Sequence, residues 1–301
     1  MSRTWRIYYN IVFGGLGGLL AWLFVGSLPD LIQNAIFWEL LTGAVAGSGI
    51  GALLGAVDGA LGKRFGRMIL GVGRGGILGF VGGILGLAIG EGLFLLTQGG
   101  FIGRSIGWGL VGAIVGTTEG IANRAPRKIS YGVLGGILGG LIGGALFEGL
   151  TQAALTFTPS GATFDPKWVT WMQAVAAGIG LVLVGACIGS FIALVEQILV
   201  SAWLKVIRGK QEGKDFNVVK SVMTIGGDDR NDIPVYDPSV GQRVAVLRQH
   251  GKEIRIESAE GAVSLTRAGS KEPLSVTTPQ TLADGDKVLV GNTLLLFRQR
   301  K

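Results

Sequence analysis

One stretch decides the fold of the first two thirds of the chain: Gly132-Val-Leu-Gly135-Gly136-Ile-Leu-Gly139-Gly140-Leu-Ile-Gly143-Gly144. Glycines four residues apart let two helix backbones approach closely inside a bilayer. In water the same stretch would be a poor helix, since each interior glycine costs about 1 kcal/mol relative to alanine. Of the 54 glycines, 44 lie in residues 1–207, set among Leu, Ile, Val and Phe. This pattern predicts closely packed, glycine-rich transmembrane helices.

Six apolar segments are near or above the ~20 residues that a helix needs to cross a bilayer. The fourth is the weakest candidate, because it is short and contains Thr117, Thr118 and Glu119. The predicted spans are 8–27, 36–60, 69–97, 105–123, 131–156 and 171–204.

The connections between the spans alternate in charge. Clusters of Lys and Arg precede the first span and follow the second, fourth and sixth, whereas the other connections contain few basic residues. By the positive-inside rule, both termini are expected in the cytoplasm, in a multi-pass protein of the cell (inner) membrane. The basic residues are Arg3 and Arg6; Lys63, Arg64 and Arg67; Arg124, Arg127 and Lys128; and Lys205, Arg208, Lys210 and Lys214.

The spans also repeat in sequence. In the even spans, Gly51-Ala-Leu-Leu-Gly55 matches Gly112-Ala-Ile-Val-Gly116 and Gly185-Ala-Cys-Ile-Gly189. In the odd spans, Gly82-Gly83 and Gly139-Gly140 are matched by Gly17-Gly18. We therefore expect one helical hairpin used three times in the same orientation, with any symmetry axis along the membrane normal.

Five acidic residues lie near the ends of these spans: Asp58, Glu91, Glu119, Glu148 and Glu196. A charged group at the bilayer centre is costly, so such residues either serve an ion or proton path, or form polar contacts that lock the bundle. The alternative is that they sit at the membrane interface, with Asp58 paired to Lys63 or Arg64, and Glu119 to Arg124 or Lys128.

No constellation of residues points to an enzyme, a cofactor or a metal ion. Gly71-Val-Gly73-Arg-Gly75-Gly76 fits G-x-G-x-x-G, but it enters a membrane span instead of a βαβ unit, where that fingerprint binds dinucleotides. Cys187 lies in an apolar run and is expected to pack there, and the single histidine, His250, is expected at the surface or in a turn. Much of the basic excess lies between spans, which argues against nucleic-acid binding.

The composition changes at about residue 208, where charged residues become frequent. We predict a membrane domain over 1–207, a linker over 208–219 and an all-β sandwich over 220–301. Short alternating segments and turn signals predict the strands 221–225, 232–236, 243–248, 253–258, 263–266, 274–277, 287–290 and 293–298.

This C-terminal region resembles a forkhead-associated (FHA) domain, a sandwich that recognises phosphothreonine. The resemblance rests on Thr224-Ile225-Gly226-Gly227, on Asp237 to Leu247, and on the closing segment Leu282-Ala-Asp-Gly285-Asp286-Lys-Val288-Leu-Val-Gly291. It covers about 80 residues and leaves the membrane half unassigned.

The chain departs from the FHA pattern at the phosphate ligands. Gly227 stands where the family has arginine, and Gly241 stands where it has serine; these are the side chains that would form charge-assisted hydrogen bonds to a phosphate. We therefore expect ordinary phosphothreonine binding to be lost. Arg230, Asn231 and Arg243 are the candidate peptide-binding face, with the two arginines able to lend charge from neighbouring positions.

These observations predict a non-enzymatic integral membrane protein that uses its cytoplasmic FHA-like domain to bind a cytosolic protein, as a membrane adaptor or assembly component. The alternative is a channel or transporter with a regulatory FHA-like domain. Glycine and aliphatic residues in the middles of the spans disfavour a wide aqueous path. The sequence leaves the partner, any transported substrate and the oligomeric state open, a homo-oligomer included.

Overall fold

The computed structural model describes residues 3–28, 34–62, 65–96, 101–156, 166–251 and 253–300. The chain divides into two compact units, one of Arg6–Gln197 and one of Ile198–Lys301 with Met1–Trp5. The first is helical and the second is a β-sandwich, and each is described by itself.

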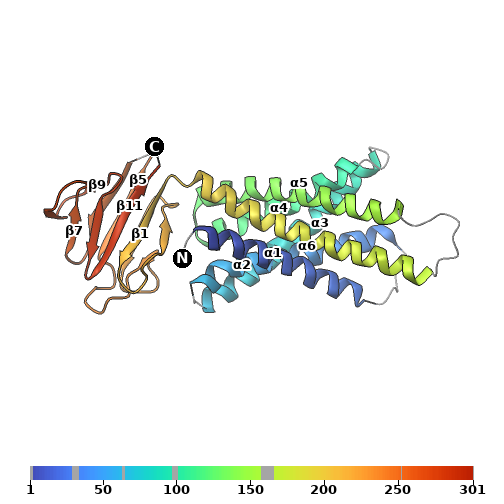
Figure 1. The fold of residues 1–301 in the computed structure, drawn as a ribbon, viewed down its shortest axis with the longest axis horizontal. Coiled ribbons are helices and arrows are strands. Elements are labelled where there is room, and N and C mark those ends of the chain that lie inside the picture. The colour runs from blue at the N-terminus through green and yellow to red at the C-terminus, as the bar shows by residue number, and fades with distance from the viewer. Residues whose placement is uncertain are drawn as a thin grey trace. The chain divides into compact units, whose positions relative to one another are not determined.

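The helical unit contains the six predicted helices, which run alongside one another (Figure 1). In the part of the chain that the structure describes, five of them are long and apolar enough to cross a membrane. The exception is α4, the predicted weak span, which is the shortest and includes Arg104 and Glu119. The helices are α1 (Arg3–Gly26), α2 (Ala35–Leu61), α3 (Phe65–Leu96), α4 (Phe101–Ala122), α5 (Pro126–Thr156) and α6 (Pro166–Leu199).

The helices form a closed ring through their glycines. In α2, α4 and α6, a Gly-x-x-x-Gly pair faces the next helix, which for α6 is α1. A Cβ added at any of these glycines would overlap the backbone of that neighbour, so only glycine permits the approach. The contacts are Gly51 and Gly55 with Gly75 and Gly71, Gly112 and Gly116 with Gly136 and Gly132, and Gly185 and Gly189 with Gly14 and Asn10.

Each odd helix contains a pair of adjacent glycines, and the two glycines of a pair contact different neighbouring helices. The first glycine of each pair faces the following even helix, and the second faces the preceding one. The three predicted hairpin repeats are therefore confirmed as equivalent packing units. The contacts are Gly17 with Ile50 and Gly18 with Leu181; Gly82 with Ile114 and Gly83 with Gly43; and Gly139 with Ile188 and Gly140 with Trp108.

Aliphatic side chains of the even helices fill the core of the ring. They fall at matching positions of the three repeats and belong to one buried cluster. One set is Ile50, Val111 and Val184, and the next, one helical turn along, is Leu54, Val115 and Ile188.

The second unit is a sandwich of two sheets. One sheet has the order β2-β1-β11-β10-β7-β8 and the other β4-β3-β5-β6-β9. Alternate residues point into a shared core, as in β6, where Ile254 and Ile256 are fully buried on either side of the exposed Arg255. The strands are β1 (Ala202–Arg208), β2 (Asp215–Asn217), β3 (Val222–Gly226), β4 (Ile233–Pro234), β5 (Ala245–His250), β6 (Glu253–Ser258), β7 (Val263–Thr266), β8 (Pro273–Ser275), β9 (Gln280–Thr281), β10 (Lys287–Val290) and β11 (Thr293–Gln299).

The sandwich begins earlier than the sequence predicted. The expected linker 208–219 contains the end of β1 and all of β2, and the last helix ends at Leu199 instead of continuing to residue 204. β1 pairs with β11 on one side and β2 on the other, and it buries Ala202, Leu204 and Val206. Ala202 and Leu204 follow the apolar helix after a single polar residue, Ser201, so composition alone extends the predicted span to residue 204.

Candidate functional site

The loops at one end of the sandwich occupy the region where the FHA resemblance places peptide binding. The loop after β3 is joined to the loop before β5 by the Gly227 amide, which donates to the Gly241 carbonyl over 2.8 Å. Asn231 strengthens the link, since its Nδ2 donates to the carbonyls of Asp228 at 2.9 Å and Gln242 at 2.6 Å. The two loops therefore form one fixed surface.

The two glycines that replace the phosphate ligands differ in their surroundings. A Cβ added at Gly227 would lie 2.7 Å from the Val240 carbonyl oxygen, whereas one added at Gly241 would make only an ordinary contact, 3.6 Å from the Glu260 carbonyl oxygen. The neighbouring loop has thus closed over the point where the family's arginine side chain would begin.

The structure places the three candidate peptide-binding residues on these two loops. Asn231 is only 4% exposed and is used to hold the loops together. Arg230 and Arg243 are exposed, each next to one partner of the Asn231–Gln242 hydrogen bond. Neither arginine side chain has an ion pair within the described ranges, so both remain free to meet a ligand.

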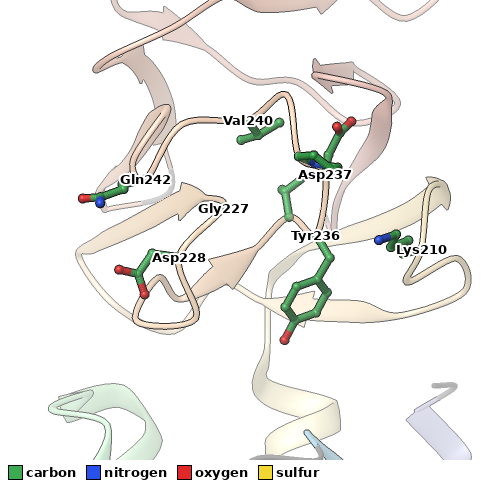
Figure 2. A pocket seen from close by; sticks show the side chains of 9 residues that line it. Lys210, Gly227, Asp228, Tyr236, Asp237, Val240 and Gln242 are labelled. Atoms are coloured by element: carbon green, nitrogen blue, oxygen red, sulfur yellow. The ribbon is translucent and has the colours of Figure 1, made fainter.

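A hollow of about 540 Å³ lies on the same surface (Figure 2). Its apolar lining comes mainly from the loop between β4 and β5, while Lys210 is contributed by the turn between β1 and β2. In the view of Figure 2, Lys210 and Asp228 lie on opposite sides of Tyr236. The lining residues are Lys210, Gly227, Asp228, Val235, Tyr236, Asp237, Pro238, Val240 and Gln242.

The charges of this hollow do not favour a phosphate group. Asp228 and Asp237 face a single lysine, Lys210. Asp237 accepts hydrogen bonds from the amide of Asn292 at 2.7 Å, and from the amide and hydroxyl of Ser239 at 2.9 and 2.7 Å. These donors, the Asn292 amide first, lower the pKa of Asp237 from its ordinary value, so the group stays anionic.

In the helical unit, the structure gathers three of the five predicted acids into one network, here called the Arg6 cluster. Asp58 and Glu119 each lie 3.0 Å from Arg6, and Glu196 lies 3.2 Å from it. Lys128 contacts Asp58 at 2.9 Å and Glu119 at 2.6 Å. The cluster therefore links five helices, because its members come from α1, α2, α4, α5 and α6. It lies at the end of the ring that contains the α2–α3 and α4–α5 connections.

The other two predicted acids meet at the opposite end of the ring, in the Arg104 cluster. The Arg104 guanidinium lies 3.6 Å from Glu91, 3.5 Å from Glu148 and 3.4 Å from Glu39. Its Cζ also lies 4.2 Å from the ring centroid of Phe94. Three carboxylates from α2, α3 and α5 therefore surround one cation from α4.

The sequence named the acids but missed most of their partners. Of the two alternative partners expected for Glu119, Arg124 and Lys128, the structure pairs it with Lys128. Lys63 and Arg64, the partners expected for Asp58, lie outside the described residues. The repeat held a usable signal, since Arg6 and Lys128 each stand eleven residues before the first glycine of their pairs, Gly17 and Gly139. Arg104 and Glu39 have no such counterpart.

Within the described ranges, no three His, Cys, Asp or Glu side chains are arranged to hold a metal ion. Cys187 is partly buried in α6 beside Gly139 and Gly143 of α5, as a small packing residue.

Comparison with known proteins bears on the sandwich. Residues 205–301 match a family described as "Inner membrane component of T3SS, cytoplasmic domain". No curated protein sequence is similar enough to the chain to count as a relative.

Solved structures of FHA domains and of one secretion component also match. The cytoplasmic domain of the T3SS sorting platform protein PscD from P. aeruginosa is 17% identical, over 33% of this chain and 80% of that chain, with a TM-score of 0.28. An FHA domain of an Arabidopsis thaliana hypothetical protein is 22% identical, over 34% and 86%, with a TM-score of 0.29. The FHA domain of human APLF, in complex with an XRCC1 bisphospho peptide, is 18% identical, over 33% and 98%, with a TM-score of 0.29. Residues 205–301, about a third of the chain, are thus similar to the cytoplasmic domain of that inner-membrane secretion family.

Proposed function

We propose that this chain is a non-enzymatic membrane adaptor or assembly component that binds a cytosolic protein through its FHA-like domain. In this proposal the ring up to Leu199 is the membrane domain, and the strands from Ala202 onward form the interaction domain. Both termini lie in the cytoplasm, as the charge alternation of the connections favours. Protease added to one side of sealed vesicles checks this: the sandwich should be cut only from the cytoplasmic side.

The observation that carries the proposal is the closed position at Gly227. A side chain there would meet the Val240 carbonyl, so the loop has no room for the phosphate ligand that the family uses. The interaction domain is therefore proposed to bind its partner without phosphorylation.

The hollow around Tyr236 indicates the chemistry of that partner. Tyr236, Pro238 and Val240 offer an apolar lining, and Asp228 and Asp237 add negative charge beside it. A partner segment with an apolar side chain next to a basic one would complement both features.

The test is capture of cytosolic proteins on the purified full-length protein, with and without phosphatase treatment of the cytosol. The same proteins should be retained in both conditions, and Tyr236→Ala should weaken their retention. Leu274→Ala is the matched control, because Leu274 is also an exposed apolar residue but lies on β8 of the other sheet. Retention that disappears after phosphatase treatment would contradict the proposal and make the domain a phosphorylation reader.

A conducting role receives less support from the ring. Its core is filled by matched sets of aliphatic side chains, such as Ile50 with Val111 and Val184, and a continuous water path would need polar groups there. The purified chain in liposomes is expected to leave ion flux unchanged.

A further inference from the structure

The basic side chains described within the ring helices differ in whether a carboxylate neutralises them. Arg6, Lys128 and Arg104 are all held in the two charged clusters. Arg74 lies within the apolar length of α3, is exposed, and has neither an ion pair nor a hydrogen bond among the described residues. It therefore differs from Arg6, Lys128 and Arg104, whose charges are neutralised by carboxylates of the ring.

Arg74 points away from the neighbouring helices. Gly71, three residues before it, and Gly75, the next residue, face α2, whereas Ile77, three residues after it, is 69% exposed. In a membrane-embedded ring this outer face of α3 meets lipid. An arginine in such a place needs an anionic partner or access to the headgroups.

The length of α3 sets the depth of Arg74. A helix of 32 residues is about 48 Å long. The hydrocarbon core is about 30 Å thick, so a centred α3 extends about 9 Å beyond it at each end. Arg74 is nine residues after Phe65, the first residue of α3, which places its Cα about 14 Å along the helix and about 5 Å inside the core. From there an arginine side chain can reach back to the phosphate level.

The internal repeat supports this depth. The residues equivalent to Arg74 in α1 and α5 are Tyr9 and Tyr131, when Gly17, Gly82 and Gly139 are aligned. Tyrosine is enriched at membrane–water interfaces. Three equivalent positions thus carry side chains suited to the same boundary.

The surface beside Arg74 is open. A Cβ added at Gly73 or at Gly66, two turns earlier, would meet no atom within 4 Å. Arg67 lies two turns before Arg74, on the same face of α3, and is also exposed.

We propose that Arg74, assisted by Arg67, binds the headgroup phosphate of an anionic phospholipid on the outer face of α3. The guanidinium donates hydrogen bonds to the phosphate oxygens, and the exposed apolar side chains of α3 contact the acyl chains. The proposal rests on the membrane placement of the ring and is independent of what the FHA-like domain binds.

The test uses the full-length protein in bilayers of mixed phosphatidylcholine and phosphatidylglycerol, with spin-labelled forms of both lipids. Wild-type protein should prefer the labelled phosphatidylglycerol at its surface, and Arg74→Gln should lower that preference, by about fivefold at the site. Arg74→Lys should keep part of it. Arg124→Gln, which removes an exposed cation at the same end of the ring, is the control and should leave it unchanged.

Two results would overturn the proposal. One is an equal preference for phosphatidylglycerol in wild type and Arg74→Gln, with thermal unfolding of the variant unchanged. The other is a fluorescent label at Arg74→Cys, in a Cys187→Ala background, that brominated lipids fail to quench, because another protein surface covers the position. If Arg74→Gln fails to fold, the comparison of Arg74→Lys with wild type decides: loss of the whole preference in the lysine variant would contradict a charge-based site.

Discussion

Glycine serves opposite purposes in the two units of this chain. In the ring glycine matters because it has no side chain, so that two helix backbones, such as those at Gly112 and Gly136, can touch. In the sandwich it supplies backbone freedom: all seven glycines with positive φ in the described residues lie there, from Gly209 to Gly291. The same residue is therefore intolerant of substitution for steric reasons in one unit and for conformational reasons in the other.

Charged residues differ between the units in the same way. Lys128 and Glu119, 8% and 13% exposed at the side chain, meet inside the ring. In the sandwich, pairs such as Arg248 with Glu257 lie at the surface, 47% and 29% exposed. Breaking a buried pair leaves an uncompensated charge, whereas an exposed pair contributes little.

The largest expected effect comes from the buried charges. Lys128→Met leaves Asp58 and Glu119 short of a cation and should lower the stability of the ring by about 3–5 kcal/mol, measured by thermal unfolding in detergent. Arg248→Met in the sandwich should cost at most about 1 kcal/mol. Adding Glu119→Gln to Lys128→Met should restore part of the lost stability, because it removes one of the unpaired carboxylates. Equal losses of stability in Lys128→Met and Arg248→Met would contradict the contrast between the units.

Next is the steric use of glycine. Gly112→Leu forces a side chain into the Gly136 backbone and should destabilise the ring by about 3 kcal/mol. Gly149→Leu, on the same ring, is the matched control, since a Cβ there meets nothing within 4 Å and leucine is the better helix former. If both variants unfold alike, glycine contacts do not hold the ring.

A smaller effect is expected from the conformational use of glycine. Gly285 has φ of +89°, and an added Cβ would lie 3.1 Å from that of Ala268. Gly285→Ala should therefore cost about 1–2 kcal/mol of sandwich stability, measured by urea unfolding of residues 198–301. Wild-type stability in this variant would mean that the turn relaxes without strain.

The smallest effect concerns Asp237 and pH. Its pKa is lowered in the folded domain, so its contribution is present above the unfolded-state pKa and is lost as the pH falls through the folded value. Asp237→Asn should slightly lower the stability of the sandwich at pH 7. At pH 2 the stabilities of wild type and variant should converge, because the contribution of the charged Asp237 is lost as the pH falls. Parallel stability curves for wild type and variant across this range would show that the Asn292 and Ser239 contacts do not depend on the charge.

The sequence was sufficient for the architecture because glycine spacing and apolar length both report on helix packing. The match of Gly51 and Gly55 with Gly112 and Gly116 predicted contacts that the structure places at equivalent positions. It was insufficient at β1, where apolar strand residues directly follow an apolar helix and composition does not mark the change.

The candidate sites were harder to predict than the fold. Asn231 was expected on the binding face, yet its side chain bonds the Gln242 carbonyl and is buried, a contact between loops that no local pattern encodes. The acids were found by their position near span ends. The cluster around Arg104 could not be predicted in this way, because its contacts with Glu39, Glu91 and Glu148 depend on how four helices are arranged.

The closure of α6 on α1 has a consequence for how the protein is made. Helix α1 leaves the ribosome before α6, and it presents Gly14 and Gly18, whose partners Gly185 and Leu181 belong to the last of these six helices to be synthesised. Until then α1 has an open edge, and so does α5, whose Gly135 and Gly139 also await α6. A chain interrupted before α6 would hold two unfilled edges, each shaped to receive α6, and a second truncated chain cannot supply the missing helix. Quality control of this protein should therefore depend on α6 reaching the membrane, immediately before the sandwich is translated.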